Sequence, residues 1–345
     1  MKRRQILGGL AAAPLLPSFA RADTGAGRLT LLVGGPDGEQ TSRWGDACAL
    51  AMAGSFPGDP QIVTQTIGGW DGLAGANRLD ALVIPDGKTA AILPGGVLIA
   101  FLTGDSRVHY DPTRWTPLLA GNTSGVLMVR APAQTQLDVD ALRTLAPLHL
   151  AADQPESRDL AALLALTRLN VPVVPVFGLR NTDAKMRAFV AGRANAVFLT
   201  GEGVPEDVAA FTAAGAVPVF SIGMMDSDGV VGPDPSFPDL PEAMKFGNSA
   251  TSFLDNAYRA VAAAARLDFM LVLPRLTDAN GVAMWSSAVG VAASSEAFVA
   301  AARASAVILQ RAPLLGSALA TLSIEAPDQG TLQAFMAKSY GWQPS

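Results

Sequence analysis

The sequence predicts an α/β protein with enough chain for two lobes, each a mainly parallel sheet flanked by helices. Its 345 residues exceed what one hydrophobic core usually holds, about 250–300 residues. Half of the residues are hydrophobic and only 16% are charged, which is typical of a folded globular chain and not of a disordered one. Short apolar runs alternate with segments of helical periodicity, and such regular alternation favours parallel sheets that helices cover on both faces.

The alternation can be followed from residue 29 to residue 221. In the first helix, apolar residues recur at i, i+3, i+4, i+7 and i+8 from Trp44 to Met52, which predicts one buried face. The expected strands are residues 29–33, 61–66, 89–93, 126–130, 148–152, 171–177, 196–199 and 217–221. After that first helix, the expected helices are residues 73–82, 139–145, 159–169 and 184–191.

Two of the expected helices begin with recognisable capping residues. Residues 153–156 (DQPE) have the pattern of a capping box before the helix at 159–169, and Thr182 is expected to cap the helix at 184–191. In parallel sheets the strands end at one edge, where the following helices present free backbone N–H groups and a favourable dipole. A bound anion is therefore expected at that edge.

Charge and cysteine content exclude several classes of protein. The formal net charge is −5, and the first 22 residues carry four basic groups and no acid, so the remainder stands at −9. This balance argues against nucleic acid and against an anionic membrane surface as partners. A single cysteine, Cys48, excludes an internal disulfide and lies on an apolar helix face, where a small core residue is expected. His109 and His149 are far apart, which argues against a histidine-rich metal site.

Residues 1–22 have the pattern of an export signal. Residues 2–4 (KRR) are basic, residues 6–19 are apolar, and residues 20–22 (ARA) place small residues where a signal peptidase cuts. The paired arginines resemble a twin-arginine signal, although a short Sec signal would have the same features. We therefore expect cleavage near Ala22 and a periplasmic mature chain. No later stretch is expected to span a membrane, because charges interrupt the apolar run at 260–272.

Four segments, taken in order, resemble the substrate-binding proteins of tripartite tricarboxylate transporters, also called the Bug family. Each is a weak signal alone, but their order and spacing over residues 29–241 are those of the family. They are residues 34–39 (GGPDGE) followed by Arg43, residues 72–77 (GLAGAN) with 85–89 (PDGKT), residues 110–118 (YDPTRWTPL), and residues 238–241 (PDLP). The rest of the chain matches in pattern only, and its final 30 or so residues are unlike the family.

The resemblance implies a two-lobed periplasmic binding protein, or Venus flytrap, with two hinge crossovers. Lobe 1 would comprise residues 23–120 and 218–345, and lobe 2 residues 121–217. Family members bind small carboxylates between the lobes, often through backbone amides and ordered waters, and hinge closure creates the surface that a membrane partner recognises. For this chain the resemblance implies a monomer that hands a small carboxylate to membrane permease subunits.

The chain also departs from the family at places expected to line the cleft. Glu39 replaces an aspartate, Trp70 and Asp71 replace an Ala-Gly turn, and Arg180 occurs where the family has an aromatic-Tyr-x-Gly loop. The candidate ligand-binding residues are Gly35, Asp37, Gly38, Glu39, Gln40, Thr41, Trp70, Asp71, Gln154, Ser157, Arg180, Asn181 and Thr182.

Each candidate also has a purely structural interpretation. Asp37 and Glu39 either complement a helix dipole or meet a ligand ammonium or hydroxyl, and Trp70 either packs on a turn or forms a pocket wall. Arg180 either binds a ligand carboxylate or faces solvent. Capping is the structural alternative for Gln154 and Ser157.

No motif for catalysis, for a cofactor or for a metal is found. The sequence has no Gly-x-Ser-x-Gly and no Cys/His cluster with metal spacing, and its glycine-rich residues 68–72 lack the lysine of a phosphate-binding loop. The hypothesis is therefore a transporter's solute-binding protein that is no enzyme. Two alternatives stay open: a periplasmic subunit that presents its solute to a membrane sensor kinase, and a binding protein for amino acids.

Overall fold

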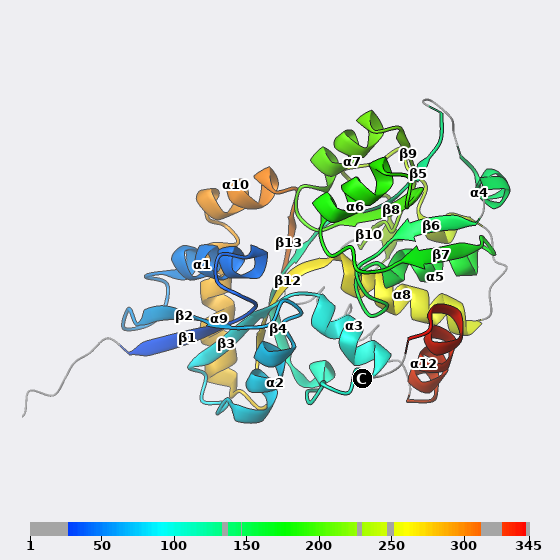
Figure 1. Cartoon of the computed structure of the whole chain (residues 1–345). Helices are drawn as coiled ribbons and strands as arrows, with labels where there is room; N and C mark the ends of the chain where they lie inside the picture. Colours follow the sequence, from blue (N-terminus) through cyan, green and yellow to red (C-terminus); the bar gives the residue numbers. More distant parts are fainter. Residues whose placement is uncertain are drawn as a thin grey trace, which may run out of the picture.

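Two separate β-sheets organise the chain in the computed structural model (Figure 1). The structure describes residues 27–132, 137–145, 147–225, 230–246, 252–311 and 326–342, so the expected export signal lies outside the described residues. The six-stranded sheet has the order β13-β4-β12-β3-β1-β2 and the five-stranded sheet has the order β7-β6-β8-β5-β9. Their strands are β1 (Arg28–Gly34), β2 (Gln61–Ile67), β3 (Thr89–Leu93), β4 (Thr116–Asn122), β5 (Gly125–Arg130), β6 (Leu148–Ala151), β7 (Val173–Val176), β8 (Ala196–Thr200), β9 (Ala216–Ser221), β12 (Leu267–Leu273) and β13 (Ile308–Arg311).

Helices cover both faces of each sheet. In the six-stranded sheet, α1, α9 and α10 share one core with the strands, while α2, α3 and α8 pack on the opposite side. In the five-stranded sheet, α6 and α7 cover one face and α5 the other. The helices are α1 (Gln40–Met52), α2 (Leu73–Leu82), α3 (Gly96–Thr103), α4 (Val139–Leu145), α5 (Leu160–Arg168), α6 (Thr182–Val190), α7 (Val204–Ala213), α8 (Ser252–Arg266), α9 (Ala279–Ala292), α10 (Glu296–Ala304) and α12 (Ala326–Tyr340).

The predicted two-lobed α/β fold is confirmed, with one correction: the sheets are mixed and not mainly parallel. Strand β1 runs parallel to β2 and β3, and β6 runs parallel to β7 and β8. Strands β12 and β5, however, run antiparallel to their neighbours, and β13 runs antiparallel to β4. The amino ends of β5, β12 and β13 therefore lie where the other strands have their carboxyl ends. The periodicity of the sequence carries no information about strand direction.

Two crossovers join the sheets, and hydrogen bonds hold them together. The chain passes from β4 to β5 through Thr123 and Ser124, and it returns through α8 into β12. Thr123 N donates to Arg266 O at 2.8 Å, and Thr200 Oγ1 donates to Ala265 O at 3.1 Å. The buried Arg266 guanidinium donates from Nε to Gly223 O at 2.7 Å. These bonds tie the end of α8 to the segments on either side of the hinge.

Sheet membership changes between Asn122 and Gly125 and again after Ser221. We expected the second lobe to comprise residues 121–217, and that these residues fold as one unit stays a prediction. The family motifs before β9, at residues 34–43, 72–89 and 110–118, all lie in the six-stranded half.

The C-terminal helix α12 contacts helices from both halves of the molecule. Gln329 Nε2 donates to Phe101 O at 2.5 Å and Gln333 Nε2 donates to Thr103 O at 3.0 Å. Both acceptors belong to the last turn of α3, where carbonyls lack the usual partner four residues on, and Phe101 O also accepts from the C-cap Gly104 N at 3.1 Å. At the far end of α12, the Tyr340 hydroxyl lies 3.3 Å from Thr167 Oγ1 on α5. Helix α12 therefore links the six-stranded half to the five-stranded half.

We expect Tyr340→Phe to lower the free energy of unfolding by about 1 kcal/mol, because it removes a buried hydrogen bond. Tyr258→Phe is the matched control: among the described residues its buried hydroxyl has no hydrogen-bond partner, so removing it costs nothing or stabilises. Urea unfolding of both variants measures the difference. Equal stabilities of the two variants would contradict a bridging role for Tyr340.

Candidate functional site

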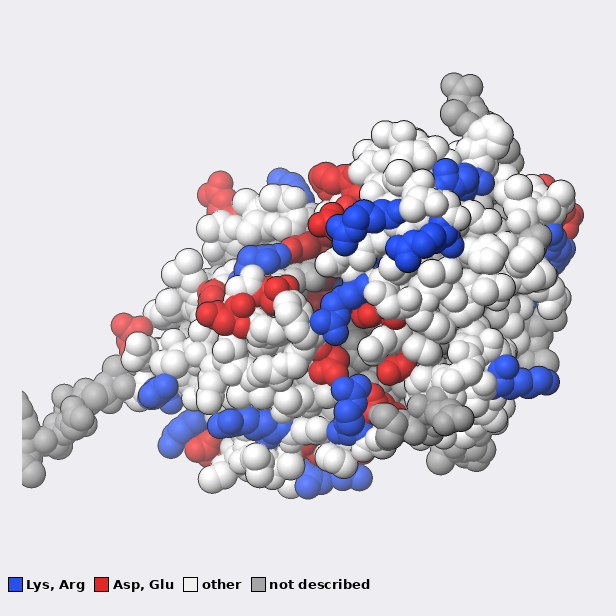
Figure 2. Space-filling view, in the orientation of Figure 1, with Lys and Arg blue, Asp and Glu red and all other residues white. Residues whose placement is uncertain are grey.

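The carboxyl ends of several strands in each sheet face the other sheet, and side chains meet across the boundary. The contacts that cross it include those of Arg43 with Glu202, of Arg158 with Asp268, and of Arg180 with Trp70. Figure 2 shows basic and acidic side chains gathered along the boundary between the two halves. Because the expected site loops follow these strand ends, the structure brings loops from both sheets to one cleft.

A buried carboxylate lies at the base of this cleft. Asp268 Oδ1, at the start of β12, accepts a hydrogen bond from Gln40 Nε2 at 2.6 Å and lies 3.4 Å from Arg158 Nη1. Arg158, from the loop between β6 and α5, also donates from Nη2 to the backbone oxygens of Leu267 at 3.0 Å and Asp268 at 3.2 Å. One guanidinium from the five-stranded half is thus bound by three acceptors of the six-stranded half.

Burial determines the protonation of Asp268. The pKa of its carboxyl is raised to about 6, chiefly by loss of solvent; Arg158 opposes this increase and the Glu202 carboxylate adds to it. Gly201, in the loop after β8, lies directly over this network with φ +106°, a conformation that glycine tolerates best. A side-chain carbon at Gly201 would lie 3.6–3.8 Å from Arg158 Nη1, Asp268 Oδ1 and Gln40 Nε2.

Two candidates predicted from sequence meet at the rim of the cleft. Trp70 follows β2 and is 57% exposed, and the Cζ atom of Arg180, after β7, lies 5.4 Å from the centre of the Trp70 ring. This is a cation–π contact between the two halves. Asp71, in contrast, is bound within its own half: its Oδ2 accepts from Arg107 Nη1 at 2.8 Å, and its Oδ1 accepts from Leu73 N at 3.2 Å.

The acids of the first loop are exposed to solvent. Asp37 and Glu39 are exposed, and so is Gly38, whose φ is +77°. Asp37 Oδ1 lies 3.4 Å from Ser42 Oγ on the following helix, and Glu39 is the N-cap residue of α1 without a side-chain capping bond. In this loop, Gly35 and Thr41 are buried and Gln40 alone reaches the Asp268 network.

The two loops of the five-stranded half are tied to each other. Gly178 N donates to Asp153 O at 2.7 Å, and Leu179 N donates to Ala152 O at 3.0 Å. Below them, the carboxylate of Asp159 accepts from Asp153 N at 2.9 Å and from Lys185 Nζ at 2.5 Å. Asp159 and Lys185 are both buried, so this ion pair holds the loop after β6 against α6.

The structure corrects the expected capping residues. Helix α6 is capped by Asn181, whose side chain accepts from Ala184 N at 2.9 Å, because Thr182 donates instead to Asp207 Oδ2 at 3.2 Å. The expected capping box at 153–156 does not form, because α5 begins later, at Leu160. Ser157 Oγ donates to Gln154 O at 2.7 Å and closes a turn. Gln154 is exposed at the start of that turn, and neither residue caps α5.

Sequence reasoning missed two cleft residues, Arg158 and Asp268, and it included Asp153 only as the first residue of the expected binding loop at 153–157. Arg158 directly follows a predicted site residue, and Asp268 is the one acid within the apolar run of β12, so both carried a local signal. What was missing is their pairing, because they are separated by 110 residues in the chain.

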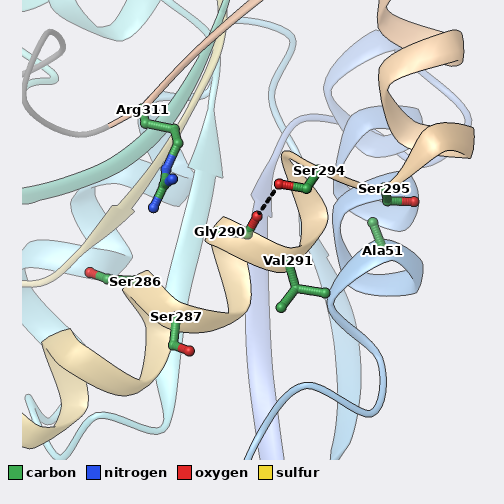
Figure 3. Close-up of a pocket in the computed structure, with 8 residues that line it drawn as sticks. All are labelled: Ala51, Ser286, Ser287, Gly290, Val291, Ser294, Ser295 and Arg311. Carbon is green, nitrogen blue, oxygen red and sulfur yellow. Dashed lines mark hydrogen bonds between the residues drawn. The ribbon is translucent and has the colours of Figure 1, made fainter.

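A second hollow lies on the outer side of the six-stranded half and holds none of the predicted site residues. Figure 3 shows four serines of α9 and the turn after it, with Arg311 of β13 pointing toward them. Its lining residues are Ala51, Ser286, Ser287, Gly290, Val291, Ser294, Ser295 and Arg311. Ser294 Oγ already donates to Gly290 O of its own helix at 3.0 Å. We assign no ligand to this hollow.

Within the described ranges, no group of three or more His, Cys, Asp or Glu side chains could hold a metal ion. No single described helix is long and apolar enough to cross a membrane, and only the bent pair α9 and α10 reaches that length and composition together.

Solved structures match nearly the whole chain. A TctC solute-binding protein from Polaromonas has a TM-score of 0.67 at 15% identity, over 90% of this chain and 98% of that one. The periplasmic binding protein BugD has a TM-score of 0.57 at 13% identity, over 90% and 97%. MatC from Rhodopseudomonas palustris, solved with bound malate, has a TM-score of 0.57 at 20% identity, over 89% and 98%.

No family model and no curated protein matches the sequence itself. At identities this low, the likeness shows the fold, and the chain has the two-lobed fold of these binding proteins. The resemblance predicted from the four sequence segments is confirmed at that level.

The raised pKa of Asp268 predicts a pH dependence of stability. An aspartate in an unfolded chain has a pKa of about 3.9, whereas the folded protein binds this proton up to a pH of about 6. The proton therefore favours the folded state, and this carboxyl makes the free energy of unfolding fall as pH rises from about 4 to about 6, by roughly 2 kcal/mol. Asp268→Asn removes that decrease.

Urea unfolding at a series of pH values from about 4 to about 7 measures how the free energy of unfolding changes with pH. Asp46→Asn, at an exposed position, is the control and should keep the pH dependence of the wild type. An unchanged slope in Asp268→Asn would show that Asp268 ionises normally in the folded protein.

Proposed function

We propose that this chain is an exported periplasmic solute-binding protein of the Bug type, which captures a small organic carboxylate between its lobes and passes it to the membrane subunits of a tripartite tricarboxylate-type transporter. One observation carries the proposal. Arg180, in the loop after β7, lies with its Cζ atom 5.4 Å from the centre of the Trp70 ring of the other half, and among the described residues no carboxylate forms an ion pair with it. An unpaired guanidinium at a cleft between two lobes is suited to bind a carboxylate with charge-assisted hydrogen bonds.

The backbone at the cleft supports the same ligand. The loops at residues 35–41, 69–72, 153–157 and 178–182 each follow a strand at the facing edges, so they offer N–H groups to an anion. The proposed ligand lies between these loops, with Arg180 at one of its carboxylates. MatC, which shares the fold, was solved with malate, a dicarboxylate.

The geometry is that of a binding protein and calls for no catalytic step. The cleft's buried charges are engaged with each other, as Arg158 with Asp268 and Lys185 with Asp159. Export rests on residues 1–22, whose basic head, apolar stretch and final Ala-Arg-Ala are those of a cleaved signal.

Arg180→Ala should weaken carboxylate binding by about tenfold to a hundredfold, since a hydrogen bond to a charged group contributes about 1.5–3 kcal/mol. Isothermal titration calorimetry with a panel of small mono-, di- and tricarboxylates measures the loss. Arg187→Ala, an exposed position on α6, is the matched control and should bind as the wild type does. An Arg180→Ala protein with undiminished affinity would remove the observation on which the proposal depends.

The mature chain should begin near Asp23. Intact mass of the protein purified from the periplasm of an expressing bacterium should correspond to loss of the first 22 residues. A full-length species confined to the cytoplasm would contradict export, and with it the transport role.

A further inference from the structure

Asp153 lies on the loop next to the one that carries Arg180. It is two residues beyond the end of β6, and its backbone oxygen accepts from Gly178 N at 2.7 Å in the loop that carries Arg180. The edge of the sheet on which both loops lie faces the six-stranded half, as shown by the contacts of Arg180 with Trp70 and of Glu202 with Arg43. An acid and a base thus occupy adjacent loops at the same face of the cleft.

The Asp153 carboxylate has no partner within the described part of the chain. Its backbone N–H is bound by Asp159, but no described residue donates a hydrogen bond to its side chain. The side chain is nevertheless half-buried. Burial and then the neighbouring Asp159 carboxylate raise the pKa of Asp153, while Arg180 and Lys185 oppose this. A half-buried acid without a partner is costly in free energy, and such groups concentrate at functional sites.

Several other acids near the cleft are engaged. Asp159 is bound by Lys185, Asp268 by Gln40 and Arg158, and Glu202 by Arg43. Asp37 and Glu39 are exposed on the first loop. Glu156, in the same loop as Asp153, has a buried Oε2 atom without a hydrogen-bond partner among the described residues. Asp153 is the acid of this loop whose own backbone is bonded to the loop that carries Arg180, so it is the acid that we expect to meet a cationic group of a ligand.

We propose that the ligand carries an ammonium group beside its carboxylate, and that Asp153 binds the ammonium while Arg180 binds the carboxylate. This inference rests on the proposed solute-binding function and narrows its ligand to amino acids and related zwitterions. The adjacent acid and base are complementary to the two opposite charges that an amino acid carries on one carbon. The exposed Trp70 ring, on the opposite side of the cleft, can cover the ligand's side chain.

The arrangement also discriminates against the corresponding ligand without an amino group. Such a compound satisfies Arg180 but leaves the Asp153 carboxylate unpaired and further desolvated. If it carries a second carboxylate near Asp153, like charges repel each other. An amino acid should therefore bind more tightly than its des-amino partner, by about tenfold or more if one charge-assisted hydrogen bond is gained.

The test compares the affinities of matched pairs of ligands, each an amino acid and the same compound without its amino group. A thermal-shift screen of the proteinogenic amino acids and their des-amino partners identifies binders, and calorimetry then gives the affinity of each member of a pair such as glutamate and glutarate, or phenylalanine and 3-phenylpropionate. The wild type should prefer the amino acid by about tenfold or more, and Asp153→Asn should abolish that preference while its des-amino affinity stays the same or improves. Asp183→Asn, an exposed acid in the first turn of α6, is the control that keeps the preference.

Each outcome separates the two proposals. Des-amino acids that bind as well as amino acids, or a preference that survives Asp153→Asn, would overturn the role of Asp153 and leave carboxylate binding intact. If no carboxylate of either kind binds, the proposed function fails and the ligand inference falls with it. Equal melting temperatures of the two variants and the wild type confirm that each is folded.

Discussion

The contact between Arg158 and Asp268 is the interaction on which the arrangement of the cleft depends. A guanidinium from one half of the molecule is bound by the side chain of Asp268 and by two backbone oxygens of β12 in the other half. Removing a carboxylate from water is costly, and a single nearby cation rarely compensates for it fully. Gln40 therefore contributes a further bond from the first loop, and Gly201 allows the loop after β8 to cover the network without a side chain.

The hinge constrains how these contacts can be made and broken. Thr123 and Arg266 join the two crossovers by a backbone hydrogen bond, and α8 packs between α3 and α5, so the halves share part of one core. Opening the cleft has to separate Arg158 from Asp268 and Arg180 from Trp70 while that bond stays in place. Helix α12 contacts α3 and α5 at its two ends, so it also has to accommodate the motion.

Charges in and around the cleft fall into two groups with different roles. Buried pairs such as Lys185 with Asp159 hold the loops, because each partner compensates for the desolvation of the other. Arg180 and Asp153 have no such partner in the described part of the chain, although they lie on hydrogen-bonded loops. The first group explains why the loops have a defined geometry, and the second is the basis of our proposals for the ligand. Asp37 and Glu39, the exposed acids of the first loop, belong to neither group.

The sequence by itself determined the features that depend on neighbouring residues. Periodicity predicted strands and helices from residue 29 to residue 221, and the family motifs predicted the two-lobed fold and the cleft loops that hold Trp70 and Arg180. Local patterns did not show where α8 ends and β12 begins, because the alanine-rich helix is followed directly by an apolar strand at Leu267.

Only the tertiary structure decided strand direction, the capping of α6 by Asn181, and the pairing of Arg158 with Asp268. The physical reason is the distance along the chain over which each effect acts. Periodicity and turn chemistry act over a few residues, whereas strand direction and charge pairing depend on which distant segments the hinge brings together.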